Sequence, residues 1–227
     1  KMEAKTGSCF LISGDNANDF DEELCIKQGK KNILLIGDSH AAHYYQGLVN
    51  SLPEFTISHA SSTGCRPHFE NEAGNRCAAL INHVYSKLLN KYQFDLIILA
   101  GRWIKMDIDL LPDTLQFLND SKLNVAILGP VIEYNQALPV LLARFGNDAQ
   151  TSDMLDSARN WQKISYMDNQ VNIIAQKADV KYISILNVMC PKKQCVVITQ
   201  EGEPIQSDYG HLTTKGAEIV LKRAINA

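Results

Sequence analysis

The chain has 227 residues, of which 45% are hydrophobic and 21% charged, and its formal net charge is -3. This length and composition suit one α/β domain with a full hydrophobic core, and the slightly acidic balance gives no reason to expect nucleic acid as a partner. No apolar run approaches the roughly 20 residues of a membrane span, and we recognise no signal peptide. Because the sequence begins at Lys1, we expect it to be a fragment or a processed form.

Residues 1–31 are polar and irregular, with turn-forming residues at Gly14-Asp15-Asn16. We expect them to form an extension packed on a domain that comprises residues 32–227. The chain contains no Gly-x-x-x-x-Gly-Lys phosphate loop, and we expect no bound cofactor.

The first strand is predicted at residues 33–36, a short apolar run with β-branched side chains. Gly37-Asp38-Ser39 interrupts it, and a helical pattern follows at once. A serine on such a turn lies at the carboxyl edge of the sheet, beside free N–H groups of the helix, where α/β folds place their chemistry. Ser39 is therefore a candidate nucleophile, although Asp38 and Ser39 could instead only cap the helix.

A second strand is predicted at residues 55–59, and residues 61–67 form a loop by composition. The loop follows a strand, so it should lie at the same sheet edge as Ser39. Gly64 is a candidate for donating a backbone N–H to the site, but it could equally serve only to permit a turn. A helix is predicted at residues 77–91.

The third strand, residues 96–100, ends in Gly101-Arg102-Trp103 at the same edge. Arg102 and Trp103 could hold a substrate or an oxyanion, or they could be a stacked packing pair.

The remaining elements continue the alternation of strands and helices. We predict helices at 112–121, 138–145, 152–178 and 217–225, strands at 125–129 and 182–186, and a short edge strand at 196–199. This alternation predicts a mainly parallel five-stranded sheet with helices on both faces.

The six cysteines fall in three local couples: Cys9 with Cys25, Cys65 with Cys77, and Cys190 with Cys195. None has the Cys-x-x-Cys spacing of a structural zinc site, so we expect no metal. An even number in loop-like segments indicates disulfides and an oxidising compartment, and we favour the local pairing because short loops close most easily. Six reduced, buried thiols remain the alternative.

A base for Ser39 can come from Asp208 and His211, three residues apart before the last helix. This spacing can bring the carboxylate to Nδ1 of the imidazole and leave Nε2 free to take the proton of Ser39. From average residue frequencies, both patterns would coincide by accident in about one chain in a thousand. We expect the other histidines to shape turns, pack or lie at the surface (His40, His43, His59, His68 and His83).

Gly37-Asp38-Ser39-His40 after a strand, with Asp208-x-x-His211 before the last helix, resembles the SGNH (GDSL-type) hydrolase superfamily. That resemblance implies a flavodoxin-like, three-layer α/β/α fold and a triad of Ser39, Asp208 and His211. The superfamily's Gly-x-Asn block is replaced here by Gly101-Arg102-Trp103, which lacks the Asn that normally helps to form the oxyanion hole.

The residues around these motifs also resemble those of a narrower group of proteins. Gly-Asp-Ser-His-Ala-Ala-His, Cys65-x-Pro67 and a strand ending in Arg102-Trp103 are similar to the SGNH domain fused behind acyltransferase-3 membrane proteins. Such proteins O-acetylate bacterial surface polysaccharides, including lipopolysaccharide O-antigen. The resemblance implies a periplasmic domain of an inner-membrane protein. It also implies an acyltransferase-3 transmembrane domain on the N-terminal side that delivers the acetyl donor, with residues 1–31 as the linker.

The leading hypothesis is therefore an O-acetyltransferase that moves an acetyl group through Ser39 to a sugar hydroxyl. A periplasmic esterase that removes acetyl groups is the alternative, because the same triad serves water as acceptor. A glycan-binding module without activity is the third hypothesis, favoured by the missing Asn and opposed by the intact triad.

Overall fold

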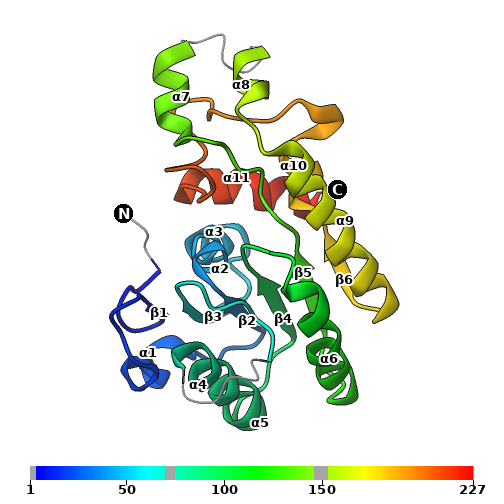
Figure 1. Ribbon diagram of the computed structural model, residues 1–227. Coiled ribbons are helices and arrows are strands. Elements are labelled where there is room, and N and C mark those ends of the chain that lie inside the picture. Colours follow the sequence, from blue (N-terminus) through cyan, green and yellow to red (C-terminus); the bar gives the residue numbers. More distant parts are fainter. Residues whose placement is uncertain (1–3, 70–74, 146–152, 227) are drawn as a thin grey trace.

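The computed structural model describes residues 4–69, 75–145 and 153–226. It contains a six-stranded parallel sheet with the strand order β1-β3-β2-β4-β5-β6. The strands are β1 (Phe10–Leu11), β2 (Asn32–Gly37), β3 (Thr56–Ser62), β4 (Leu96–Ala100), β5 (Val125–Leu128) and β6 (Lys181–Ile183). Helices cover both faces (Figure 1), which confirms the predicted three-layer α/β class and corrects the strand number from five to six.

The central strand β2 explains why both faces are covered. All six of its residues are buried, and neighbouring side chains along a strand point to opposite faces. Ile33 and Leu35 belong to one hydrophobic cluster and Leu34 and Ile36 to the other. A continuous apolar run of this kind is typical of a parallel strand between two helical layers.

The helices on the first face of the sheet come from both the early and the late parts of the chain. This first layer contains α2 (Ser39–Ala42), α3 (Tyr45–Ser51), α7 (Leu138–Phe145), α8 (Asp153–Ser157), α10 (Ile185–Met189) and α11 (Thr214–Ile225). Gly47 of α3 lies so close to α11 that a Cβ atom at this position would be 2.9 Å from the Cβ of Ala217. This close contact brings the C-terminal segment against the helices that follow β2.

The second layer contains α4 (Arg76–His83), the π-helical turn η2 (Val84–Leu88), α5 (Leu89–Lys91), α6 (Asp107–Asp120) and α9 (Trp161–Lys177). α6 begins well before Pro112, where the predicted helix starts. Asp107 opens this helix and accepts a hydrogen bond from the N–H of Ile104.

The polar N-terminal segment forms more structure than expected. It contributes β1, η1 (Ala17–Asp19) and α1 (Glu22–Cys25). Phe10 and Leu11 pair with the end of β3, but two residues are too short a run to stand out as a strand in the sequence. The disulfide between Cys9 and Cys25 closes this segment, and the pairs Cys65–Cys77 and Cys190–Cys195 are also disulfide-bonded, as predicted.

Three further predictions differ from the structure. The strand predicted at residues 182–186 ends at Ile183, because Ser184 caps α10 and accepts a hydrogen bond from the N–H of Asn187. The long helix predicted from residue 152, which lies outside the described residues, is two helices. They separate where Arg159 forms an antiparallel bridge with Tyr134. Residues 196–199 form no named strand, and only an isolated bridge joins Ile198 to Pro204.

Candidate active site

Ser39 is the first residue of α2, directly after β2. The chain turns there through Gly37, whose φ of +152° and close approach to β4 exclude a side chain: a Cβ would lie 1.7 Å from the carbonyl oxygen of Ala100. Gly37 thus allows the end of β2 to lie close to β4, and it places Ser39 at the carboxyl edge of the sheet.

Asp38 caps α2 and links it to the end of β4. Its side chain accepts hydrogen bonds from the N–H of His40 at 2.7 Å and from the N–H of Arg102 at 3.0 Å. The side chain is almost fully buried, and burial raises its pKa to about 6, although these N–H donors favour the charged form. Asp38 therefore fixes the geometry of the turn that carries Ser39.

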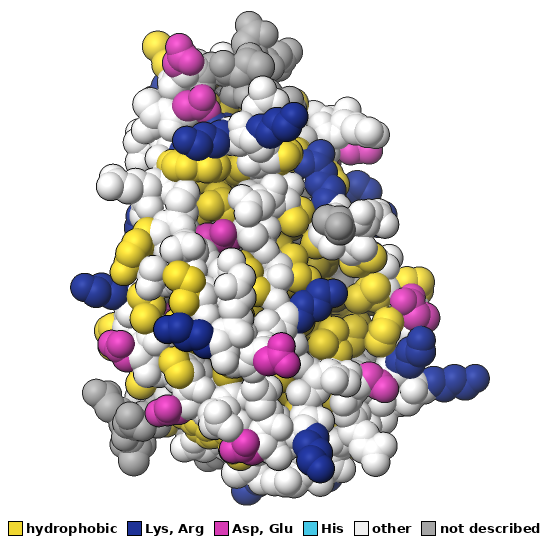
Figure 2. All heavy atoms as spheres, turned by 90° about the vertical axis from the view of Figure 1, so that its right-hand side faces the viewer, with side chains coloured by type: hydrophobic (Ala, Val, Ile, Leu, Met, Phe, Trp, Pro, Cys, Tyr) yellow, Lys and Arg dark blue, Asp and Glu magenta, His cyan; other side chains and the backbone are white. Residues whose placement is uncertain are grey.

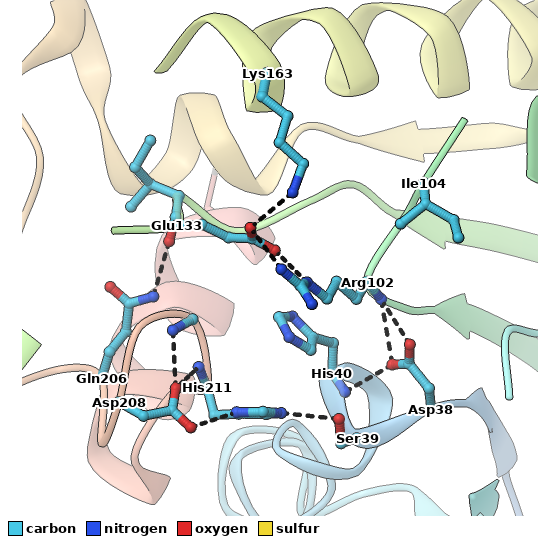
Figure 3. A network of polar contacts seen from close by, with 12 residues as sticks. Asp38, Ser39, His40, Arg102, Ile104, Glu133, Lys163, Gln206, Asp208 and His211 are labelled. Atoms are coloured by element: carbon cyan, nitrogen blue, oxygen red, sulfur yellow. Dashed lines mark hydrogen bonds and ion pairs between the residues drawn. The ribbon is translucent and has the colours of Figure 1, made fainter. Parts of the chain in front are cut away.

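Asp208 and His211 approach Ser39 from the loop before α11. Nε2 of His211 lies 2.8 Å from Oγ of Ser39, and Nδ1 lies 2.7 Å from Oδ2 of Asp208 (Figure 3). The other carboxylate oxygen, Oδ1, accepts from the N–H groups of Gly210 and His211, both at 2.8 Å. The structure thus brings together the three residues that the sequence paired.

The electrostatics of Asp208 suit a charged carboxylate. Burial disfavours its charge, but the N–H groups of His211 and Gly210 outweigh this cost and hold its pKa below the usual value. An ionised Asp208 can orient the imidazole of His211 and stabilise its protonated form.

His40 and His43 support the imidazole of His211, a role that the sequence did not reveal. The ring centroid of His40 is 4.5 Å from that of His211, and Nδ1 of His43 accepts from the N–H of Leu212 at 3.3 Å. Both are buried, and burial lowers the pKa of His40 to about 3 and that of His43 well below its usual value. They pack as neutral rings, and their position on the turn after Ser39 was the available signal.

Arg102 connects three loops at the site. Its guanidinium makes two hydrogen bonds to Glu133, from Nε at 2.6 Å and from Nη2 at 3.1 Å (Figure 3). It also lies 4.9 Å from the ring centre of Tyr209. Lys163 contacts the same carboxylate at 3.1 Å. Burial disfavours the charge of Glu133, yet the two cations hold its pKa below the usual value. No pattern in the sequence marks Glu133, a carboxylate in a loop without a partner at a recognisable spacing.

Of the two interpretations of Trp103, the structure supports packing. Its side chain is buried and its Nε1–H donates to the carbonyl of Leu128 at 2.8 Å, so it is a packing residue. The backbone N–H of Arg102 is bonded to Asp38 and is not free for an oxyanion. Gly64 adopts the left-handed backbone of a turn, with φ +76°, and its role as a donor stays a prediction.

The buried carboxyl group of Asp107 contacts the loop that contains Gly64. His68 Nε2 lies 2.8 Å from Oδ1 of Asp107, and Nε of Arg66 lies 3.4 Å from the same oxygen. This loop is therefore anchored to the start of α6.

The described parts of the chain offer neither a cluster of metal ligands nor a helix suited to a membrane. They contain no group of three or more His, Cys, Asp or Glu side chains placed to hold a metal ion. Within the same residues, no helix has the length and apolar character needed to cross a membrane.

Comparison with protein families matches residues 8–225 to the model described as "SGNH domain (fused to AT3 domains)". The chain belongs to this family. The match includes β1 and the disulfide between Cys9 and Cys25, which lie in the polar N-terminal segment. Comparison with curated protein sequences found no match.

Solved structures share the fold of this SGNH domain. It is similar to the periplasmic domain of a lipopolysaccharide acetyltransferase from Salmonella ser. Paratyphi A, with a TM-score of 0.80 and 24% identity over 97% of this chain and 90% of that one. It is also similar to a carbohydrate acetylesterase from Sinorhizobium meliloti, with a TM-score of 0.55 and 12% identity over 86% and 96% of the two chains.

Proposed function

We propose that this SGNH domain is an O-acetyltransferase that places an acetyl group on a sugar hydroxyl of a bacterial surface polysaccharide, such as lipopolysaccharide O-antigen. The observation that carries the proposal is the unbroken chain of contacts from Ser39 Oγ through His211 to Asp208. The family's fusion to AT3 domains supports an acyltransferase rather than a free-standing hydrolase.

The reaction has two proton-balanced halves. His211 takes the proton of Ser39 as Oγ attacks the acetyl donor, and it returns that proton to the donor's leaving group, which yields acetyl-Ser39. His211 then takes the proton of the sugar hydroxyl, which attacks the ester, and gives it back to Ser39 as the acetyl group leaves. Asp208 stabilises the imidazolium formed in each half.

The oxyanion of each tetrahedral intermediate needs hydrogen-bond donors near Ser39. The N–H of Ser39 is suited to this role, because the first N–H groups of a helix have no carbonyl partner one turn earlier. Gly64 is the second donor in the proposal. We assign no donor to the backbone of Arg102, since Asp38 occupies its N–H.

The proposed setting is the periplasm, with an acyltransferase-3 transmembrane domain as the partner that supplies the acetyl group. The family's fusion pattern supports this partner. Three disulfides support an oxidising compartment.

The test is acetylation of surface glycan in cells that express the full-length protein with Ser39→Ala. We expect acetylation to be lost, whereas Ser51→Ala, a serine on α3 outside the contact chain, should leave it unchanged. Unaltered acetylation in Ser39→Ala would sink the proposal. If wild-type cells instead lose acetyl groups that the Ser39→Ala cells keep, the domain is an esterase.

A further inference from the structure

A hollow of about 450 Å³ lies outside the Ser39 site. It is bordered by the junction of α8 and α9, the loop closed by the Cys190–Cys195 disulfide, and the last turn of α11. Its lining includes Asp156, Arg159, Lys193, Gln194 and Arg223, and none of Ser39, Asp208 and His211 lines it. Its volume falls within the range of small-molecule sites.

Arg159 is the unusual member of this lining. Its side chain is only 3% exposed, and its Nη1 pairs with the exposed carboxylate of Asp156. Nε and Nη2 are buried with no hydrogen-bond partner among the described residues. The hydroxyl of Tyr134, whose backbone pairs with that of Arg159, is buried beside the guanidinium, and its pKa is raised by burial and lowered in part by that neighbouring positive charge.

Leaving these donors unpaired is costly. A buried N–H without a partner loses the free energy of its hydration, and the loss is larger for a charged group. Because Arg159 lines the hollow, an acceptor that enters from solvent and reaches these donors would restore the lost hydrogen bonds.

The other charges around the hollow favour an anion. Three cationic side chains, Arg159, Lys193 and Arg223, line it against the single carboxylate of Asp156. Nζ of Lys193 lies 5.8 Å from the ring centre of Trp161, which places it beside the start of α9. Figure 2 shows Lys and Arg side chains spread over the right-hand face of Figure 1, several of them in its upper part with Asp and Glu side chains among them.

We propose that this hollow binds an oxyanion, the phosphate or carboxylate group of an anionic saccharide. The planar donors of Arg159 match the oxygens of either group, and Lys193 and Arg223 supply the surrounding positive charge. The volume leaves room for a sugar ring attached to the anion. This site is separate from Ser39 and does not depend on the acetyl transfer proposed above.

The test is a titration of the ¹⁵N-labelled 227-residue chain with inorganic phosphate, with glucuronate and with neutral glucose. We expect phosphate, glucuronate or both to shift the Nε–H resonance of Arg159, and glucose to leave it unchanged. Binding of phosphate alone assigns the site to a phosphorylated ligand, and binding of glucuronate alone assigns it to a uronic acid. No shift with either anion, or an equal shift with glucose, would overturn the proposal.

A pair of double variants controls for general charge effects. Lys193→Gln with Arg223→Gln removes two exposed cations of the hollow and leaves the buried Arg159 in place. We expect the affinity for the bound anion to fall about tenfold. Lys30→Gln with Lys87→Gln makes the same change in net charge at exposed positions that do not line the hollow, and the affinity should stay unchanged. Equal affinities for the two double variants would refute the site, and Ser39→Ala should bind the anion as the wild-type chain does.

Discussion

The two carboxylate oxygens of Asp208 have different partners, one in the backbone of its own loop and one in the imidazole of His211. Oδ1 receives the N–H groups that hold the loop, and Oδ2 contacts Nδ1 of His211. An amide in the same place can keep the first set of bonds through its oxygen, but its NH₂ group cannot accept from Nδ1–H. The substitution Asp208→Asn therefore separates the two roles.

For Asp208→Asn we expect a loss of acetyl transfer of at least about 100-fold, because the imidazole of His211 loses its orienting acceptor. The melting temperature should change little, because the bonds to Oδ1 remain. Transfer rates and thermal unfolding of the same protein preparation check both parts. A variant with wild-type activity would contradict the assigned role of Asp208.

His59 should make the stability of the fold depend on pH. It is buried in β3, neither ring nitrogen has a hydrogen-bond partner among the described residues, and burial lowers its pKa to about 3. Between pH 6.5 and about 3 the unfolded chain binds a proton at His59 that the folded chain does not. Folding must release that proton, so stability falls as the pH decreases through this window.

We expect His59→Phe to relieve this cost. At pH 5 the variant should gain about 2 kcal/mol in the free energy of unfolding relative to its own effect at pH 7.5. Ile57→Val, a change to a non-titrating side chain on the same strand, should have equal effects at both pH values. Urea unfolding at the two pH values measures the difference, and equal effects of His59→Phe at both would contradict the account.

Ser39, His211 and Asp208 could be predicted because each belongs to a recognisable local pattern in this sequence. Asp208 and His211 are three residues apart, and Ser39 follows a strand, so both signals are present within short stretches of sequence. Glu133 could not be predicted, since its partners Arg102 and Lys163 lie far away along the chain and only the fold brings them together. The two interpretations of Trp103 could not be separated from the sequence, because the end of a strand does not reveal on which side its next residues are buried.

At the scale of elements, the sequence predicts strands that are long apolar runs, but it does not reveal elements that are short or interrupted. The central strands β2 and β4 are buried runs that stand out in any window of the sequence. β1 has only two residues, and its pairing depends on β3 and on the disulfide beside it. The break between α8 and α9 depends on the backbone bridge from Arg159 to Tyr134, a tertiary contact that helical periodicity cannot show.

The disulfide between Cys9 and Cys25 should stabilise the edge of the sheet. It closes a loop of 16 residues, for which the chain-entropy model gives about 3 kcal/mol. We expect Cys9→Ala with Cys25→Ala to lower the free energy of unfolding by about that amount, measured by urea unfolding. Removing Cys190–Cys195, with a separation of only 5 residues, should cost less, and the reverse order would contradict this reasoning.

At the scale of the whole molecule, the proposal divides the work between two domains. The proposal assigns a nucleophile, a base and an orienting carboxylate to this chain, and the acetyl group is proposed to arrive from a fused membrane domain. We therefore expect the isolated 227-residue chain, exported to the periplasm of cells that lack the full-length protein, to leave surface glycan unacetylated. The full-length protein should restore acetylation. Restoration by the isolated chain would contradict the need for a membrane partner.

The central claim is that Ser39 carries the acetyl group. The most direct measurement is mass spectrometry of peptides from the chain after brief exposure to an activated acetyl ester. The account predicts an acetyl group on Ser39 that is absent from His211→Ala and does not form on Ser51. An acetyl group found only on other residues, or equal acetylation of Ser39 in the wild-type chain and in His211→Ala, would contradict it.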